Sequence, residues 1–248
     1  MAQLKVFFAN NSERNFSYVL ESTNKAWVID PFDPEPIIDY IKKNDLKLQG
    51  ILNTHKHWDH VKGNTELQNT LGSGPLSLND QLKIKLDQED YLQVINSPGH
   101  TREHQVYIWV SKEKVVGLFS GDTLFNGGVG NCKNGGDPDL LFETIQNLKK
   151  LPESIILYPG HDYARKNLQF ALSVEPENEA IEAYINRFDK ASSELGLKWT
   201  LGDELKFNPF LRLDSQKIRQ KLNLTQIEDS HNTDRDVFLK LRKLRDNW

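Results

Sequence analysis

The sequence predicts a mixed α/β protein that ends in a helical segment. Short apolar runs closed by Asn, Ser or Asp-Pro recur through the first 160 residues, as is typical of strands. After Gly160 the apolar residues follow helical spacing and β-branched residues become rare. A chain of 248 residues with 38% hydrophobic content can form one long domain, or one domain with a smaller appendage. We therefore expect a larger domain at residues 1–161 and a helical domain at residues 162–248.

The larger domain is expected to be rich in strands. Eight apolar runs have the length and boundaries of strands: Leu4–Phe8, Phe16–Leu20, Ala26–Ile29, Gly50–Asn53, Leu92–Ile95, Val106–Val110, Val115–Phe119 and Ile155–Tyr158. An early helix is predicted at Pro34–Lys43, because Pro36 is tolerated in a first turn and Ile37, Ile38 and Ile41 form an apolar stripe. Further helices are predicted at Asp139–Lys150, Asn167–Val174, Asn178–Glu194, Ser215–Asn223 and Asp234–Arg245.

Composition excludes several classes of function. The 31 basic and 35 acidic residues give a net charge of −4, which does not suit a protein selected for phosphate contacts with nucleic acid. No stretch approaches ~18 apolar residues and residues 1–11 lack a signal-peptide pattern, so we expect a soluble, cytoplasmic protein without a membrane partner. The single cysteine, Cys132, excludes an internal disulfide and a thiolate zinc finger.

The segment Thr54–His60 carries three imidazoles and a carboxylate in one short turn after a predicted strand. His55 and His57 are two residues apart, so both can face one ion, whereas Asp59 and His60 follow too closely to share it. A second ion, ~3.5–4 Å from the first, would use them. Three further metal-capable side chains follow small or turn-forming residues at predicted strand ends: His100, Asp122 and His161.

These motifs resemble the metallo-β-lactamase superfamily, with its H-x-H-x-D-H signature followed by isolated His, Asp and His ligands. The segments Pro98-Gly99-His100-Thr101, Gly121-Asp122-Thr123-Leu124-Phe125 and Gly160-His161-Asp162-Tyr163 are similar to those of the hydroxyacylglutathione hydrolase (glyoxalase II) family. So are Asn208-Pro209-Phe210-Leu211-Arg212 and the terminal Arg242-x-x-Arg245-Asp246. The resemblance implies a four-layer αββα sandwich with a smaller C-terminal α-helical domain that binds substrate.

The resemblance also implies the ligand set. One divalent ion would be held by His55, His57 and His100, and a second by Asp59, His60 and His161, with Asp122 bridging them. Zinc is the preferred metal, and iron or manganese remain open because the mixed nitrogen and oxygen donors do not discriminate. The expected reaction is hydrolysis of S-(2-hydroxyacyl)glutathione, such as S-D-lactoylglutathione, by a metal-bound hydroxide. Asp59 is the expected catalytic residue, and a monomer acting in methylglyoxal detoxification is expected.

The residues expected to contact glutathione depart in part from the family pattern. In the glycine-rich loop Gly127–Gly136, Asn131 stands where the family has a basic residue and Lys133 where it has an aromatic one. Lys133 would supply a cation to a peptide carboxylate. Tyr163, Arg242 and Arg245 correspond to family positions that touch glutathione. Taken alone, the basic cluster that includes Lys240 and Lys243 is also typical of a solvated helix face.

Three other residues receive interpretations from their context. Asp30, which ends a predicted strand, either orients a histidine ligand or simply terminates the strand in an Asp-Pro turn. Trp58 is interpreted as packing the start of the helix against the sheet, with a wall of the substrate pocket as the alternative. Cys132 is interpreted as inert, with oxidation or a mixed disulfide with glutathione as the alternative.

Two other enzyme functions stay open. A mononuclear iron persulfide dioxygenase of the same superfamily would use fewer ligands, and a hydrolase of another thioester would keep the metals with a different thiol. Phosphodiester cleavage is disfavoured by the net charge. A non-catalytic module is disfavoured by the complete ligand set.

Overall fold

The computed structural model describes residues 1–9, 11–190, 198–224 and 233–248. Within these ranges, no helix is long and apolar enough to cross a membrane. By its internal contacts the chain divides into two compact units. The first comprises residues 1–96, 103–122 and 158–162, and the second comprises residues 97–102, 123–157 and 163–248. This division does not test the boundary expected between residues 161 and 162, which stays a prediction.

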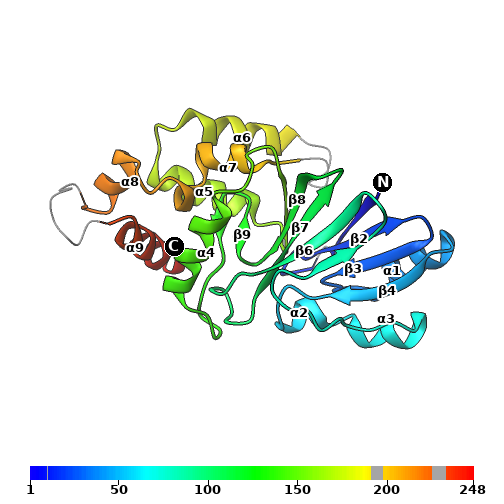
Figure 1. Cartoon of the computed structure of the whole chain (residues 1–248). Coiled ribbons are helices and arrows are strands. Elements are labelled where there is room, and N and C mark those ends of the chain that lie inside the picture. The colour runs from blue at the N-terminus through cyan, green and yellow to red at the C-terminus, as the bar shows by residue number, and fades with distance from the viewer. Residues whose placement is uncertain (10, 191–197, 225–232) are drawn as a thin grey trace. The chain divides into compact units, whose positions relative to one another are not determined.

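Two β-sheets form the framework of the first unit (Figure 1). The four-stranded sheet has the order β1 (Gln3–Phe8), β2 (Phe16–Ser22), β3 (Lys25–Ile29) and β4 (Lys47–Leu52), with the β3–β4 pair parallel. The five-stranded sheet has the order β11 (Ile156–Pro159), β8 (Lys114–Gly121), β7 (Gln105–Ser111), β6 (Asp90–Asn96) and β5 (Lys83–Lys85). Its β5–β8 strands form an antiparallel meander.

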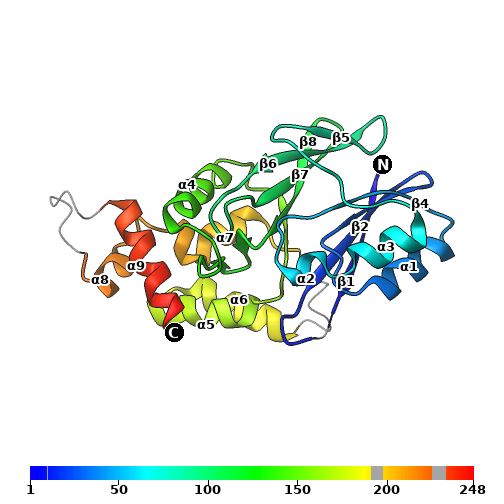
Figure 2. The same cartoon turned by 90° about the horizontal axis from the view of Figure 1, so that it is seen from below.

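Helices cover one face of the four-stranded sheet. Helix α1 (Pro34–Lys43) turns Ile37, Ile38 and Ile41 inwards, and α3 (Asn64–Leu71) contributes Leu67. These side chains pack on Val19, Ala26, Val28, Leu48 and Ile51 of the sheet. Helices α1 and α3 lie side by side in Figures 1 and 2. The parallel β3–β4 connection therefore follows from the predicted amphipathic helix between these strands.

The two sheets pack face to face through a second apolar core. Alternate residues of the four-stranded sheet, including Tyr18, Leu20 and Trp27, meet buried residues of the other sheet, including Tyr107 and Phe119. Alternation is what a strand buried on one face requires. One helix layer and two sheet layers of the expected sandwich are thus present in the first unit. The short helix α2 (Trp58–Val61) follows β4 at the edge of this sandwich.

The second unit is mainly helical. Its helices are α4 (Pro138–Leu148), α5 (Ala164–Val174), α6 (Glu179–Lys190), α7 (Leu201–Phe207), α8 (Gln216–Lys221) and α9 (Asp234–Asp246), with a 3₁₀ turn at Pro209–Leu211. Helices α5 and α6 run side by side, and α4 lies against α9 (Figures 1 and 2). The expected helix at Asn178–Glu194 is described only to Lys190, so the rest of that expectation lies outside the described residues.

A small hairpin in the second unit is held by buried polar side chains. Strands β9 (Leu124–Phe125) and β10 (Gly128–Val129) are joined through Asn126 and Gly127. Glu204, which is fully buried in α7, accepts hydrogen bonds from Gly127 N at 2.8 Å and Asn126 Nδ2 at 3.1 Å. Asn208 Nδ2 donates to Gly128 O at 3.2 Å. Helix α7 thereby fixes the start of the glycine-rich loop.

Candidate metal centre and substrate pocket

The turn after β4 is fixed at both ends by one carboxylate. Asp30, directly after β3, accepts hydrogen bonds from Thr54 N at 2.7 Å and from Thr54 Oγ1 at 2.6 Å. The same carboxylate lies 2.9 Å from His60 Nδ1. The expectation that Asp30 orients a histidine is confirmed for His60. With Nδ1 committed to Asp30, the Nε2 atom of His60 is the one left to face a metal ion.

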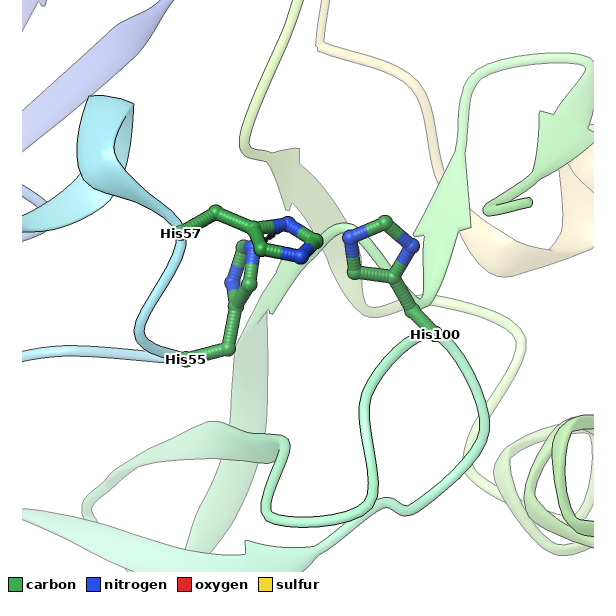
Figure 3. Close-up of side chains that lie close together, drawn as sticks. All are labelled: His55, His57 and His100. Atoms are coloured by element: carbon green, nitrogen blue, oxygen red, sulfur yellow. Dashed lines mark hydrogen bonds between the residues drawn. The ribbon is translucent and has the colours of Figure 1, made fainter. Parts of the chain in front are cut away.

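The first group of candidate ligands consists of imidazoles alone. His55 Nε2 lies 2.9 Å from His57 Nδ1, and ring nitrogens of His55, His57 and His100 all lie within 4.8 Å of one another. Figure 3 shows the three rings turned towards one another, His55 and His57 from the loop after β4 and His100 from the loop after β6. His100 Nδ1 lies 2.7 Å from the carbonyl oxygen of Asn131, so this ring donates there and presents Nε2.

A second group combines a carboxylate with two imidazoles. His60 Nε2 lies 3.2 Å from His161 Nε2, and Asp59 Oδ2 lies 3.5 Å and 3.4 Å from these two nitrogens. The Nδ1 atom of His161 donates to the carbonyl oxygen of Glu13 at 2.7 Å. Donor atoms of Asp59, His60 and His161 all lie within 4.8 Å of one another. These are the three residues expected to share the second ion.

Asp122, directly after β8, lies close to members of both groups. Its Oδ1 atom is 3.4 Å from His60 Nε2 and 3.3 Å from His161 Nε2, and it also falls in a potential ligand group with His55 and His60. Small neighbours permit this approach, since a Cβ at Gly160 would stand 2.5 Å from Asp122 Oδ1. Gly121 adopts φ of 48° and is equally crowded, by Thr54 Oγ1.

Electrostatic interactions within this cluster favour the protonated form of two histidines and the ionised form of one aspartate. Burial alone would lower the pKa of His60, but the carboxylates of Asp122 and Asp30 outweigh it and hold that pKa well above its usual value. The pKa of His161 is raised in the same way, mainly by Asp122. Burial would raise the pKa of Asp122, but His161 and His60 hold it well below its ordinary value. Facing imidazole nitrogens beside carboxylates match the donor set of divalent zinc, iron or manganese.

The sequence interpretation missed two buried polar residues beside this cluster. His104 is 1% exposed, its Nε2 accepts the backbone N–H of Asp122 at 3.2 Å, and its ring stacks on that of His55. Asn15 is equally buried and donates to Asp59. His104 stands directly before β7, so its place just before the predicted strand Val106–Val110 was a usable signal. Nothing in the sequence linked Asn15 to Asp59.

The packing interpretation of Trp58 is wrong. Its side chain is 62% exposed and touches Phe32 only edge to face, with the ring centroids 5.8 Å apart. The helix α2 spans only one turn, so the side chain that follows His57 points outwards while Asp59 and His60 point inwards. Trp58 therefore does not join the helix start to the sheet.

The five residues expected to contact the substrate line one pocket of the second unit. The pocket has a volume of about 270 Å³. It is lined by Phe125, Val129, Asn131, Lys133, Tyr163, Lys166, Asn167, Arg242, Arg245, Asp246 and Trp248. Four basic side chains against one acidic side chain give it a positive character. Lys166, on the exposed side of α5, was not identified from the sequence.

The two arginines of this pocket have different surroundings. Arg242 is 6% exposed, donates to the carbonyl oxygens of Val129 and Gly130 at 2.9 and 3.0 Å, and pairs with Asp246. The alternative of a solvated helix face is therefore wrong for Arg242. Arg245 is half-buried, with its guanidinium over the rings of Phe170 and Trp248.

The glycine-rich loop contributes two polar residues and the cysteine. Lys133 is exposed and its Nζ donates to the carbonyl oxygen of Asp246 at 3.2 Å, while Asn131 Oδ1 accepts the backbone N–H of Lys133. Cys132 is half-buried, and burial raises the pKa of its thiol to about 11. A protonated thiol is a poor nucleophile, which agrees with the inert role expected for it.

Known proteins are similar to this chain in sequence and in fold. Residues 162–248 match the family described as hydroxyacylglutathione hydrolase C-terminus, and residues 13–94 match the metallo-β-lactamase superfamily. A hydroxyacylglutathione hydrolase of Nitrosococcus oceani is 36% identical over 260 residues, which cover 96% of this chain and 97% of that protein.

Solved structures agree with this likeness. A metallo-β-lactamase from Staphylococcus aureus subsp. aureus COL matches 98% of this chain and 72% of its own, with a TM-score of 0.65 and 20% identity. The protein TTHA1623, solved in a di-iron-bound form, matches 83% of this chain and all of its own, with a TM-score of 0.59 and 25% identity. The expected metallo-β-lactamase fold is confirmed by these likenesses.

Proposed function

We infer that this chain, which belongs to the hydroxyacylglutathione hydrolase family of the metallo-β-lactamase superfamily, hydrolyses S-(2-hydroxyacyl)glutathione to glutathione and a 2-hydroxy acid. The observation that carries this conclusion is the likeness to a curated hydroxyacylglutathione hydrolase over nearly the whole of both chains. The reaction makes the protein a metal-dependent thiolester hydrolase. S-D-lactoylglutathione is the proposed substrate, which would place a cytoplasmic monomer in methylglyoxal detoxification.

The proposed centre holds two divalent ions. His55, His57 and His100 would hold one, Asp59, His60 and His161 the other, and Asp122 would serve both. The three ligand groups found among the described residues support this division. Zinc is the preferred metal and iron or manganese the alternatives, and the di-iron form of TTHA1623 supports two ions. When bound, such ions lower the pKa of water from ~15.7 towards ~7 and polarise a carbonyl group.

Asp59 is the proposed catalytic side chain. Its carboxylate is only 8% exposed, and its Oδ2 atom is oriented by Asn15. In this position it would accept a hydrogen bond from the attacking water and direct its lone pair at the thioester carbon. The leaving thiolate has a conjugate acid of pKa ~8.5 and departs without a strong general acid. No nucleophilic serine or cysteine is needed.

The thiol portion of the substrate is proposed to bind in the pocket lined by Tyr163, Lys133 and Arg245. Glutathione carries carboxylates, and Lys133, Lys166 and Arg245 provide cations for them. Arg242 already donates to two loop carbonyls, so its proposed part in binding is to build the wall of the pocket. Asn131 contributes in the same way, through its hydrogen bond to the backbone of Lys133.

One assay separates this function from the two alternatives. Metal-loaded protein is supplied with S-D-lactoylglutathione and with other thioesters, thiol release is followed, and ions per chain are counted. We expect release of thiol from glutathione thioesters and two ions per chain. If thiol were released only from another thioester, the protein would be a hydrolase of that thioester and not of a glutathione thioester. Oxygen consumption with glutathione persulfide and one iron per chain would indicate a persulfide dioxygenase instead.

A further inference from the structure

Asn15 connects the backbone near one candidate ligand with the side chain of another. It lies directly before β2, is 1% exposed, and forms an isolated antiparallel bridge with His161. On either side of it, Phe16 N donates to Gly160 O at 2.8 Å and Asp162 N donates to Arg14 O at 3.0 Å. The main chain around Asn15 therefore holds the strand end from which His161 projects.

The side chain of Asn15 reaches the carboxylate of Asp59. Its Nδ2 atom donates to Asp59 Oδ2 at 3.0 Å and lies 3.4 Å from the carbonyl oxygen of the same residue. Asp59 Oδ2 is also the atom that lies 3.4 Å from His161 Nε2 and 3.5 Å from His60 Nε2. The amide thus acts on the carboxylate oxygen that faces both imidazoles.

Asn11 determines which way this amide points. Asn11 Nδ2 donates to Asn15 Oδ1 at 2.9 Å, and Asn11 Oδ1 accepts the backbone N–H of Asn15 at 3.2 Å. Because Oδ1 of Asn15 is used as an acceptor, its NH₂ group must be the one that faces Asp59. The chain Asn11, Asn15, Asp59 therefore presents a donor to a carboxylate in a nearly dry environment.

We propose that Asn15 is a positioning residue that joins Asp59 and His161 into one cation site and sets the affinity of that site alone. This inference rests on the two-ion centre of the proposed function. The hydrogen bond from Asn15 Nδ2 restricts rotation of the Asp59 carboxylate and keeps its Oδ2 atom facing the two imidazoles, which favours metal binding. Residues that orient metal ligands in this way change metal affinity by roughly 10- to 100-fold.

The test is a zinc titration of the metal-depleted full chain, in which the affinity of each binding step is measured by calorimetry and by chelator competition. In Asn15→Ala, we expect one of the two binding steps to weaken by roughly 10- to 100-fold and the other to remain unchanged. Asn11→Ala keeps the donor but frees the amide, so a smaller loss in the same step is expected. This second variant also serves if Asn15→Ala fails to fold.

The control is Asn44→Ala. Asn44 is exposed and its Nδ2 atom donates to the carbonyl oxygen of Tyr40 at 2.8 Å, so this change removes an asparagine hydrogen bond without touching a candidate ligand or a residue bonded to one. Both binding steps should match the wild type. Equal weakening of both steps in Asn15→Ala, or no weakening in any folded variant, would overturn the inference alone. A wild-type chain that binds a single ion would overturn the proposed centre with it.

Discussion

The candidate metal centre and the cationic pocket hold their side chains in different ways. In the metal centre, the candidate ligands other than the half-buried His57 are buried, and several are oriented by another residue: His60 by Asp30, His161 by the carbonyl of Glu13, and Asp59 by Asn15. In the pocket, Lys133 and Lys166 are exposed. Orientation of this kind costs adaptability but gives precise geometry.

This difference explains where the chain follows its family and where it departs. A buried side chain with two partners cannot change without leaving a polar group unpaired. An exposed lysine such as Lys133 carries no such constraint, and it lies in the loop where we expect the chain to depart from the family pattern. We expect substitutions in the metal centre to affect the chemical step and substitutions in the pocket to affect binding.

The largest effect is expected from Asp59→Ala. The change removes a candidate ligand and the group proposed to orient the attacking water, so kcat should fall by about 10³-fold or more while the fold is kept. The measurement is kcat for S-D-lactoylglutathione together with circular dichroism and metal content. Near-normal turnover at full metal occupancy would contradict the catalytic role of Asp59.

A smaller effect is expected from Asp30→Ala. Loss of this carboxylate frees the ring of His60 and removes both bonds to Thr54, so zinc affinity should fall by roughly 10- to 100-fold. Chelator competition measures the change, and activity at saturating zinc should return in part. If zinc affinity stays at the wild-type value, orientation by Asp30 does not contribute to binding.

The metal centre and the pocket also differ in how many of their residues could be predicted from the sequence. The metal ligand candidates were found because the chain has only 7 histidines and because each candidate follows a strand whose apolar pattern is clear. Asn15 was not found, because its role depends on a contact with Asp59 across 44 positions of the chain. The pocket residue Lys166 was missed for a different reason: an exposed lysine on a helix has no distinguishing pattern.

Some elements of the fold were missed for physical reasons. Helix α3 buries a single apolar residue, Leu67, so it has no apolar stripe to detect. Helix α7 is short, and its start was readable only from the capping box formed by Thr200 and Asp203. The longer α1 and α9, which have clear apolar faces, were predicted within one residue of their bounds.

The pocket is expected to respond to substitution through KM. Arg245 is half-buried and available at the pocket, so Arg245→Ala should raise KM by about tenfold and leave kcat near its wild-type value. Arg242→Ala should instead lower the melting temperature, because two loop carbonyls and Asp246 lose their donor. Steady-state kinetics and thermal unfolding separate the two. If Arg242→Ala raised KM as much as Arg245→Ala does and left the melting temperature unchanged, this assignment of roles would be contradicted.

The smallest effect concerns the pH dependence of stability. Burial raises the pKa of Glu204 to about 8, although three N–H donors from Gly127, Asn208 and Asn126 oppose the shift. Between the ordinary value near 4.5 and about 8, the folded chain keeps a proton that the unfolded chain has lost. The contribution of Glu204 to stability must therefore decrease as pH rises through this window, by about 1.4 kcal/mol per pH unit.

The variant Glu204→Gln isolates this contribution, because glutamine has the shape of protonated glutamate and cannot ionise. Denaturation at pH 6 and pH 7.5, at equal metal loading, should show a weaker loss of stability with pH in the variant than in the wild type. Glu175→Gln is the control. Glu175 is also buried, but its hydrogen bonds and its ion pair with Arg212 outweigh burial and lower its pKa. Its ionisation therefore does not change the dependence of stability on pH between pH 6 and pH 7.5. Equal slopes in the wild type and Glu204→Gln would mean that Glu204 is already ionised at pH 6. The hairpin at Gly127 would then be held by a buried carboxylate, in the way that Asp30 holds the metal turn.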